Sequence, residues 1–248
     1  DVAARLVEMD SSGVVLQAVC LPPFLMCSTS QDADLVAEVL ARGNKALADL
    51  VAQAPTRLVA LGSVPLGTPQ AAVEAARLLD AGVRGVAIGT RGMGCELDDA
   101  VNEPLWELLA ARQVFCFLHP SGVPDAHRLR DFYLPQLLGY PMETAIAVTR
   151  LVMSGVRERH PFPLCLAHGG GCLPWVRGRL DMGWERKEVA RAAPRPPGEY
   201  LGSLFYDTAV FSPQLLGALV ALGRDAAATH ALAWGNAAGL LGLEGEAA

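Results

Sequence analysis

Two histidines stand at equivalent places in the sequence, each directly after a short apolar run. The run 114–118 ends in His119, which a proline follows, and the run 164–167 ends in His168, which three glycines follow. Runs this short and this rich in Val, Phe, Leu and Cys are typical of buried strands. Because active sites of parallel α/β barrels lie at the carboxyl ends of the strands, we expect both imidazoles to face one pocket.

Each histidine also has a structural interpretation. A single histidine at the end of a strand is more often bonded to the backbone than used for chemistry, and this alternative applies to His119. His168 could instead cap the helix that follows it. Its unperturbed pKa of about 6.5 suits proton transfer near neutrality. The glycines after His168 let the backbone approach a ligand closely, which favours a functional site.

Composition narrows the class of protein and its partners. The chain has 248 residues, of which 52% are hydrophobic and 19% charged, as expected for one domain with a sheet buried on both faces. The net charge is −6, and no basic run argues for nucleic acid. A small anionic ligand needs only one or two arginines, so a small-molecule carboxylate remains a suitable substrate.

The cysteines and the apolar segments bear on the compartment. Six cysteines form no CxxC pair, which favours a reducing cytosol over a disulfide framework. The segment 11–31 is uncharged, but Pro22 and Pro23 argue against a membrane helix there. We therefore expect a cytoplasmic protein without a membrane partner. Because Asp1 stands directly inside a helical pattern, the start of the protein is expected upstream of it.

Strand and helix patterns alternate along the chain. Strands are predicted at 14–21, 58–65, 82–89, 114–118, 164–167 and 204–210. Helices are predicted at 2–9, 32–53, 68–81, 103–112, 141–156, 174–191 and 213–222, with a last one ending near Leu243. This alternation predicts a parallel sheet with right-handed crossovers. A closed barrel needs eight strands, so the pattern leaves open a barrel lacking two strands or an open doubly wound sheet.

Three connecting or amphipathic segments carry further expectations. Residues 121–131 are polar and irregular, and residues 193–198 are expected to form an exposed loop. The helix 141–156 is expected to bury one apolar face. That face would comprise Met142, Ala145, Ile146, Val152, Met153 and Val156.

The order of several segments resembles one family. These segments are GSVPL at 62–66, GVRGVAIGT, FLHP, YLPQLLGYPMETA, LCLAHGGG, VRGRLDMGW, EYLGSLFYDTA and WGNAAGLLGL. The chain is similar to the zinc-dependent barrel decarboxylases of the amidohydrolase-related superfamily, which include aminocarboxymuconate semialdehyde decarboxylase. The most specific part is AHGGG followed by Gly178-Arg179 and Trp184. The resemblance implies a distorted (β/α)8 TIM barrel, formed by residues 1–248 as a single domain, that binds one zinc ion.

The resemblance also assigns roles to particular residues. It implies that His119 is a zinc ligand and that His168 is the catalytic histidine beside the metal. Arg179 would bind a substrate carboxylate in the active site of the partner subunit, which makes the protein a homodimer. Ser121 and Gln136 would line the mouth of the substrate site, where close relatives carry tryptophan.

Two parts of the family pattern are absent from this sequence. It contains no His-x-His pair, and the aspartate segment expected near Asp225 and Ala226 is replaced by a direct passage into the last helix. The barrel's first and eighth strands are therefore expected to be missing, through truncation at the amino terminus and a gap near 225/226. Because three of the four zinc ligands would go with them, we expect weak zinc binding or none.

Three functions remain open at this point. The first is decarboxylation of 2-amino-3-carboxymuconate 6-semialdehyde, or a similar small unsaturated carboxylate, in tryptophan catabolism of the kynurenine type. The second is hydrolysis by a zinc enzyme of the amidohydrolase superfamily. The third is a catalytically inactive relative that serves as a dimer partner or regulator. The role of Asp207 is also open, because it could orient a histidine or a water, or be a structural acid bonded to amides.

Overall fold

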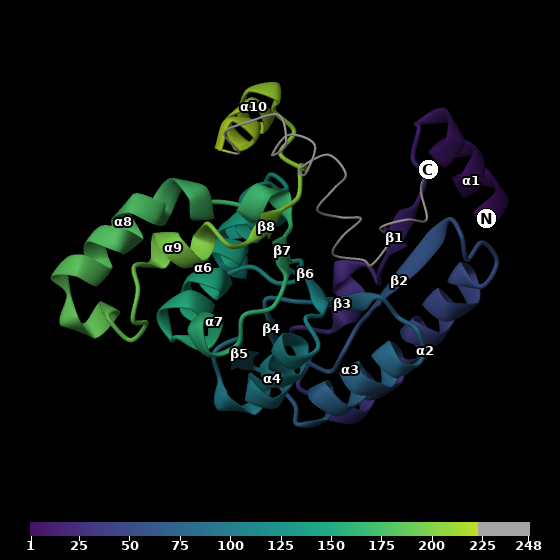
Figure 1. Cartoon of the computed structure of the whole chain (residues 1–248), viewed down its shortest axis with the longest axis horizontal. Helices are drawn as coiled ribbons and strands as arrows, with labels where there is room; N and C mark the ends of the chain where they lie inside the picture. The colour runs from purple at the N-terminus through teal and green to yellow at the C-terminus, as the bar shows by residue number, and fades with distance from the viewer. Residues whose placement is uncertain (223–248) are drawn as a thin grey trace.

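A computed structural model describes the backbone of residues 1–222 and the side chains of residues 1–217. Its centre is a curled sheet of six parallel strands in the order β1-β2-β3-β6-β7-β8 (Figure 1). The strands are β1 (Gln17–Val19), β2 (Leu58–Gly62), β3 (Gly85–Ile88), β6 (Phe115–Leu118), β7 (Leu164–Leu166) and β8 (Phe205–Tyr206). The predicted α/β class and all six predicted strands are confirmed. Among the described residues, β1 and β8 form the two edges.

Helices follow most of the strands and lie around the outside of the sheet (Figure 1). They are α1 (Val2–Ser11), α2 (Ala33–Val51), α3 (Gln70–Asp80), α4 (Glu103–Ala111), α6 (Tyr140–Met153), α7 (Val156–Arg159), α8 (Leu173–Arg186), α9 (Pro197–Leu201) and α10 (Pro213–Leu222). Asp32 caps α2, because its carboxylate accepts a hydrogen bond from the Leu35 amide at 3.0 Å. None of the described helices is both long and apolar enough to span a membrane.

Alternate residues of each strand face opposite sides of the sheet, which produces separate cores. On the side covered by α3, α4 and α6, the strands contribute Val86, Ile88, Cys116, Leu118, Leu164 and Leu166. Trp106 of α4 is fully buried in this core and donates a hydrogen bond from Nε1 to the Leu97 carbonyl at 3.0 Å. The opposite side carries a smaller cluster around Leu61 and Ala87, against which Phe115 and Phe117 are only partly buried.

The predicted face of the 141–156 helix is partly wrong. Ala145 and Val152 are buried, but Met142 and Ile146 are 37% and 42% exposed. The face of the helix that contacts the core instead includes Ala147, Val148 and Leu151, which are buried. The pattern also covers two helices, since α6 ends at Met153 and α7 begins after a glycine in the left-handed region.

Two connections are more ordered than the sequence indicates. Residues 121–131 contain the short helix α5 (Ala126–Leu129), which Asp125 caps by accepting from the Arg128 amide at 3.1 Å. The segment 193–198 is exposed only in part, because Pro194 and Arg195 are exposed whereas Ala193, Pro197 and Gly198 are buried. The Ala193 carbonyl accepts a bond from Trp184 at 2.8 Å, and the Gly198 amide donates to Asp181 at 2.6 Å.

Several smaller elements connect the main strands and helices. A hairpin of β4 (Arg91–Gly92) and β5 (Cys95–Glu96) follows β3, and the 3₁₀ turn η1 (Pro23–Met26) follows β1. A π-helical turn, η3 (Pro135–Gly139), leads directly into α6. The predicted gap near Asp225 and Ala226 and the last predicted helix lie outside the described residues.

Candidate active site

Parallel pairing brings the ends of four strands into one row. The register pairs Ile88 with Leu118, Leu118 with Leu166, and Leu166 with Tyr206. The next residues along each strand are therefore neighbours. His119 donates from its amide to the Ile88 carbonyl at 3.0 Å, and the amide of Asp207 donates to the Leu166 carbonyl at 3.0 Å. His119 and Asp207 come directly after the paired residues, and His168 comes one residue later, after Ala167, so three polar side chains lie at the carboxyl edge of the sheet.

His119 and His168 lie against one another. Their ring centroids are 4.7 Å apart, and the ring planes meet at 71°. Tyr140, the first residue of α6, adds a third ring. It stacks nearly parallel to His168, with centroids 6.4 Å apart, and meets His119 edge-on at 6.0 Å. The sequence placed the two histidines in one pocket but assigned no role to Tyr140, although the residue stands in the YPMETA motif.

Burial keeps both imidazoles neutral near pH 7. Desolvation lowers the pKa of His168, and the nearby carboxylate of Asp207 opposes this effect only in part. Desolvation also lowers the pKa of His119, and the neighbouring His168 lowers it further. The hydrogen bond to the Pro120 carbonyl and the charge of Asp207 raise this pKa, but the net shift is downward. Since a carbonyl only accepts, the 2.7 Å contact from His119 Nδ1 to the Pro120 oxygen places the proton on Nδ1. Nε2 of His119 then carries the free lone pair.

Asp207 holds the turn that carries His168. Its Oδ1 accepts from the Gly169 amide at 2.8 Å and from the Ala209 amide at 3.1 Å. Asp207 could have bonded a histidine, a water or backbone amides, and the structure shows its carboxylate bonded to neighbouring amides. Its charge acts on the histidines through space rather than through a hydrogen bond. Nδ1 of His168 is buried and has no hydrogen-bond partner among the described residues.

Four consecutive residues of this turn adopt left-handed backbone conformations. The φ angles are 57° at His168, 60° at Gly169, 76° at Gly170 and 61° at Gly171. A Cβ on Gly170 would lie 2.7 Å from the Tyr206 ring, and one on Gly171 would lie 2.3 Å from the Pro141 carbonyl oxygen. The glycines therefore allow β8 and the start of α6 to pack against the turn. His168 itself bears a backbone cost of about 1–2 kcal/mol.

A cavity of about 570 Å³ opens beside His168. Its lining is mostly apolar and includes Leu137, Leu138, Pro141, Trp175, Val210, Phe211 and Leu215. Gln136 and the glycine turn also contribute to it. The volume suits a small organic ligand, and the walls would shield such a ligand from water. His168 and Gln136, both predicted from the sequence, are thus brought to one cavity.

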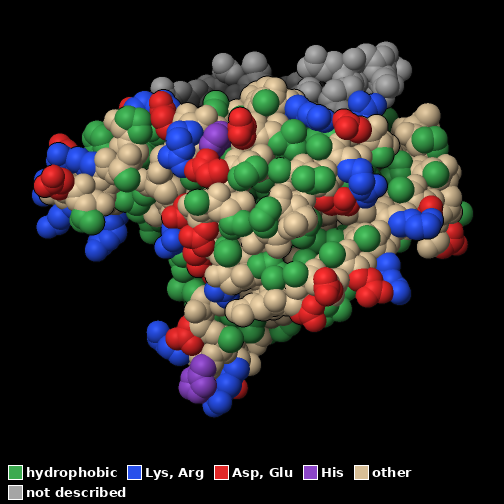
Figure 2. Space-filling view, turned by 90° about the horizontal axis from the view of Figure 1, so that it is seen from below, with side chains coloured by type: hydrophobic (Ala, Val, Ile, Leu, Met, Phe, Trp, Pro, Cys, Tyr) green, Lys and Arg blue, Asp and Glu red, His purple; other side chains and the backbone are tan. Residues whose placement is uncertain are grey.

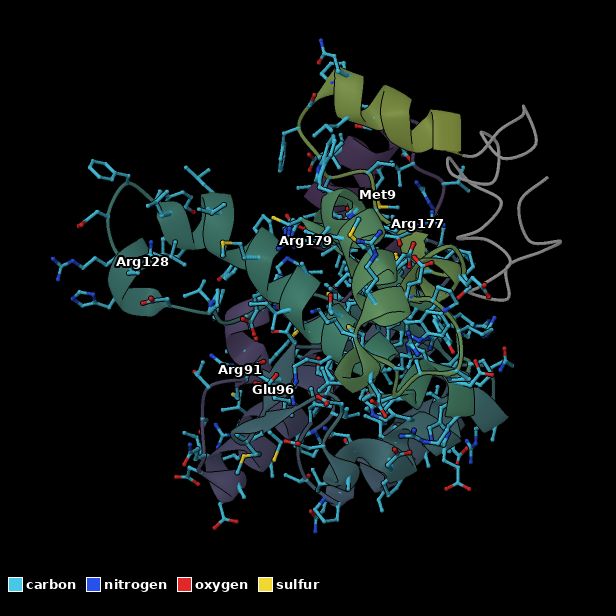
Figure 3. All side chains as sticks on the ribbon, turned by 90° about the vertical axis from the view of Figure 1, so that its left-hand side faces the viewer. Met9, Arg91, Glu96, Arg128, Arg177 and Arg179 are labelled. Atoms are coloured by element: carbon cyan, nitrogen blue, oxygen red, sulfur yellow. The ribbon has the colours of Figure 1, made fainter. Side chains whose placement is uncertain are left out.

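Three predicted residues, His119, Arg179 and Ser121, do not line this cavity, although His119 contacts His168. Arg179 is exposed on α8, one turn beyond Trp175 (Figure 3). Ser121 lies two residues beyond His119, and its hydroxyl donates to the Ser28 hydroxyl. Neither contacts the histidine pair through a hydrogen bond found among the described residues.

A metal site is not complete in the described part of the chain. No group of three or more His, Cys, Asp or Glu side chains there could hold a metal ion. His119 offers one lone pair on Nε2, whereas Asp207 is engaged by two amides. Because a catalytic zinc needs about three protein ligands, the described residues do not fit a metal centre on their own.

Comparison with known proteins identifies the family. A model described as amidohydrolase matches residues 26–220, and the chain belongs to this family. It is 31% identical over 229 residues to 2-amino-3-carboxymuconate-6-semialdehyde decarboxylase of Dictyostelium discoideum, covering 90% of this chain and 63% of that protein. It is 29% identical over 245 residues to gamma-resorcylate decarboxylase of Rhizobium sp. (strain MTP-10005), covering 89% and 73%. The chain thus spans slightly less than two thirds of the first of these relatives.

Solved structures show the same fold. The chain superposes on 5-carboxyvanillate decarboxylase from Sphingomonas paucimobilis with a TM-score of 0.79 at 24% identity, covering 96% of this chain and 82% of that one. It superposes on dihydroxybenzoic acid decarboxylase from Polaromonas sp. JS666 with a TM-score of 0.81 at 22% identity, covering 97% and 86%. The expected barrel class is therefore confirmed.

We expect Gly171→Ala to lower the free energy of unfolding by at least about 2 kcal/mol, because it adds left-handed strain and a clash with Pro141. Gly183→Ala in α8 is the matched control, since a Cβ there meets nothing within 4 Å. Urea unfolding of both variants measures the difference. Equal stability of the two would contradict the packing role of the turn.

We expect the free energy of unfolding to fall as the pH is lowered below about 6.5, the ordinary pKa of histidine in an unfolded chain. The fall should continue until the pH reaches the pKa of His168 in the folded protein, which burial makes lower. The sign follows because the unfolded chain binds the proton more tightly than the folded chain. His168→Asn should reduce this dependence, since asparagine tolerates the left-handed backbone and does not titrate. The comparison requires unfolding free energies between pH 5 and about 8. An unchanged slope in this variant would refute the pKa assignment.

Proposed function

We propose that this protein removes carbon dioxide from a small unsaturated or aromatic carboxylate. The observation that carries the proposal is a neutral His168, paired with His119, at the wall of a mostly apolar cavity. The family relationship supports it, because both relatives described above and both solved structures are named decarboxylases. The chain's own fold supplies the cavity and the proton-transfer group that such a reaction needs.

The reaction defines what these residues must do. Breaking the bond to the carboxylate carbon leaves an electron pair on the substrate carbon, and this carbon then takes up a proton. His168, whose ring borders the cavity, would deliver that proton. Because its lowered pKa leaves the ring neutral near pH 7, the ring would first take a proton from solvent and then pass it to the carbon as an imidazolium. The apolar lining would keep water away and favour release of neutral carbon dioxide over the bound carboxylate.

For the substrate we propose a 2-amino-3-carboxymuconate 6-semialdehyde or a close analogue, in tryptophan catabolism of the kynurenine type. Relatives of that name in Dictyostelium discoideum and Caenorhabditis elegans share 31% and 27% identity with this chain. Gln136 and Trp175 would contact the substrate skeleton, since both line the cavity. Ser121 would lie further along the mouth.

We also propose a divalent metal ion, with zinc as the family resemblance implies. The Polaromonas structure contains bound manganese together with 2-nitroresorcinol. In this chain His119 would contribute Nε2 as a ligand, and a bound ion would polarise a substrate oxygen. The described residues do not complete such a site.

We propose further that the protein is a cytoplasmic homodimer, with Arg179 directed to the partner's cavity. Trp175, Arg179 and Met182 lie on one exposed side of α8, and Trp175 and Met182 are 75% and 51% exposed. A second copy would cover this apolar strip. Six free cysteines suit a reducing compartment. On the face drawn in Figure 2, acidic and basic side chains are interspersed, which gives no support to a nucleic-acid partner.

The decisive experiment follows carbon dioxide release and substrate absorbance together, with Zn²⁺ or Mn²⁺ in excess. We expect release from the aminocarboxymuconate semialdehyde, reduced by about 10²-fold or more in His168→Ala. His127→Ala, in exposed α5, is the matched control and should keep full activity. Cleavage of an amide or lactone without carbon dioxide would instead establish the hydrolase alternative. No turnover at any metal concentration would indicate an inactive relative.

We expect the chain of residues 1–248 to hold zinc weakly or not at all, because the described residues offer one ligand where about three are needed. Metal analysis after dialysis should find far less than one ion per chain. Near-stoichiometric zinc that is lost in His119→Ala but kept in His127→Ala would show that the prediction is wrong.

A further inference from the structure

The orientation of the His168 ring lacks the support that a hydrogen bond usually gives to a histidine. Nδ1 of this ring is buried without a partner among the described residues, and the Asp207 carboxylate accepts from two backbone amides instead. A bond to one ring nitrogen normally selects the tautomer and the orientation. Without it, a half turn about the Cβ–Cγ bond would exchange nitrogen for carbon on both edges of the ring. Another contact must therefore hold the imidazole that borders the cavity.

Two neighbouring rings supply this contact. Tyr140 lies nearly parallel to the His168 imidazole, with 15° between the planes and 6.4 Å between the centroids, which is an offset stack. His119 meets the same imidazole at 71°, with centroids 4.7 Å apart. Because Tyr140 and His119 themselves meet at 77°, they confine the imidazole from two directions. A half turn about Cβ–Cγ would have to carry the His168 ring across this stack.

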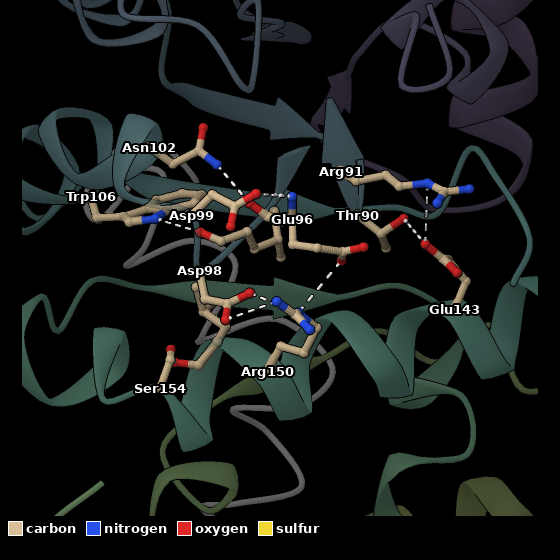
Figure 4. Close-up of polar contacts among 12 residues, drawn as sticks. Thr90, Arg91, Glu96, Asp98, Asp99, Asn102, Trp106, Glu143, Arg150 and Ser154 are labelled. Atoms are coloured by element: carbon tan, nitrogen blue, oxygen red, sulfur yellow. Dashed lines mark hydrogen bonds and ion pairs between the residues drawn. The ribbon is translucent and has the colours of Figure 1, made fainter. Parts of the chain in front are cut away.

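Tyr140 is itself held by the first turn of α6. The carbonyl of the next residue, Pro141, accepts a hydrogen bond from the Cys172 amide at 3.2 Å. Glu143, also in this turn, is 5% exposed and accepts from the Thr90 hydroxyl at 3.1 Å (Figure 4). These two bonds connect the start of α6 to the glycine turn and to the segment that follows β3. The ring of Tyr140 therefore has a fixed base from which to restrain the imidazole.

Tyr140 does not line the cavity beside His168. A substitution of Tyr140 therefore removes no contact that this cavity offers to a ligand, and its effect on the reaction would pass through the histidines. Proton delivery is sensitive to such an effect, because a donor misplaced by about 1 Å loses roughly 10²-fold in rate. An imidazole that samples several orientations would spend only part of its time in the productive one.

We propose that Tyr140 is a positioning residue whose ring face holds the His168 imidazole for proton delivery to the substrate carbon. The inference rests on the proposed function and adds a residue that the reaction needs although it does not touch the substrate. The side-chain contacts found for Tyr140 among the described residues are those of its ring. The hydroxyl is consequently dispensable, and phenylalanine should serve as well as tyrosine.

Rates of carbon dioxide release separate positioning from substrate binding. With Zn²⁺ or Mn²⁺ in excess, we expect Tyr140→Leu to lower kcat about tenfold or more and to change KM less than about twofold, because the cavity lining is intact. Tyr140→Phe should keep kcat within about twofold of the unaltered protein. Tyr133→Leu is the matched control, because Tyr133 is 65% exposed and does not line the cavity. An unchanged kcat in Tyr140→Leu, or an equal loss in the leucine and phenylalanine variants, would overturn the proposal.

The motion of the imidazole reports the restraint without turnover. Carbon-13 relaxation of histidine-labelled protein gives an order parameter for the His168 ring, whose signal is assigned by its absence in His168→Asn. We expect about 0.85, typical of a rigid group, in the unaltered protein and in Tyr140→Phe, and less than about 0.6 in Tyr140→Leu. Tyr140→Met fills the space with a flexible chain and replaces the leucine variant if urea unfolding shows that one to be poorly folded. A rigid imidazole in the variants without an aromatic ring would contradict the proposal.

The two proposals can fail separately. If the unaltered protein releases no carbon dioxide but Tyr140→Leu loosens the imidazole, the decarboxylase proposal is wrong and the restraint of His168 by Tyr140 is supported. If carbon dioxide is released, and Tyr140→Leu neither slows its release nor loosens the imidazole, only the role of Tyr140 is wrong.

Discussion

The bond between the Asp207 carboxylate and the Gly169 amide determines much of the candidate site. At 2.8 Å it joins the end of edge strand β8 to a turn whose backbone is left-handed at four successive residues. The amides of Gly170 and Gly171 close the turn within itself by donating to the carbonyls of Ala167 and His168, and the Asp207 bond ties it to the neighbouring strand. The orientation of His168, the close approach of α6 through Pro141 and the wall of the cavity all follow from that turn. An edge strand of two residues thus has a structural consequence larger than its length suggests.

The same carboxylate also sets an electrostatic balance at the site. Burial among apolar walls favours neutral imidazoles, and the negative charge of Asp207 opposes this for both His119 and His168. If the carboxylate bonded directly to an imidazole, it would stabilise the protonated ring much more strongly. Because its hydrogen bonds go to amides instead, the histidines retain a lowered pKa and remain able to exchange a proton. The backbone bonds of Asp207 therefore serve both the shape and the acidity of the site.

The sequence predicts the scaffold better than the contacts that complete the site. All six strands could be predicted because apolar runs between turn residues are dictated by burial, and the pairing of β6 with β7 then brings His119 to His168. The contacts of Tyr140 with the histidine rings and of Ser121 with Ser28 could not be predicted, since they join segments separated by many residues. The exposure of Met142 and Ile146 was missed for a related reason: periodicity shows that a helix has an apolar stripe, but its neighbours decide which part is covered. Nothing in the sequence indicates that Gly89 must be glycine because the hydroxyls of Ser28 and Ser121 pack against it.

The described strands carry the histidine pair but not the other metal ligands that the family resemblance implies. The described sheet supplies the ends of β6, β7 and β8, and these carry the histidine pair and Asp207. The metal ligands that the family resemblance implies on the barrel's first and eighth strands would have to approach from the side of the edges β1 and β8. Phe115, Phe117 and Cys165, which face away from the helices, are only partly buried there. The acid and base groups are consequently fixed by contacts internal to the described chain, whereas a metal ion would need ligands beyond His119.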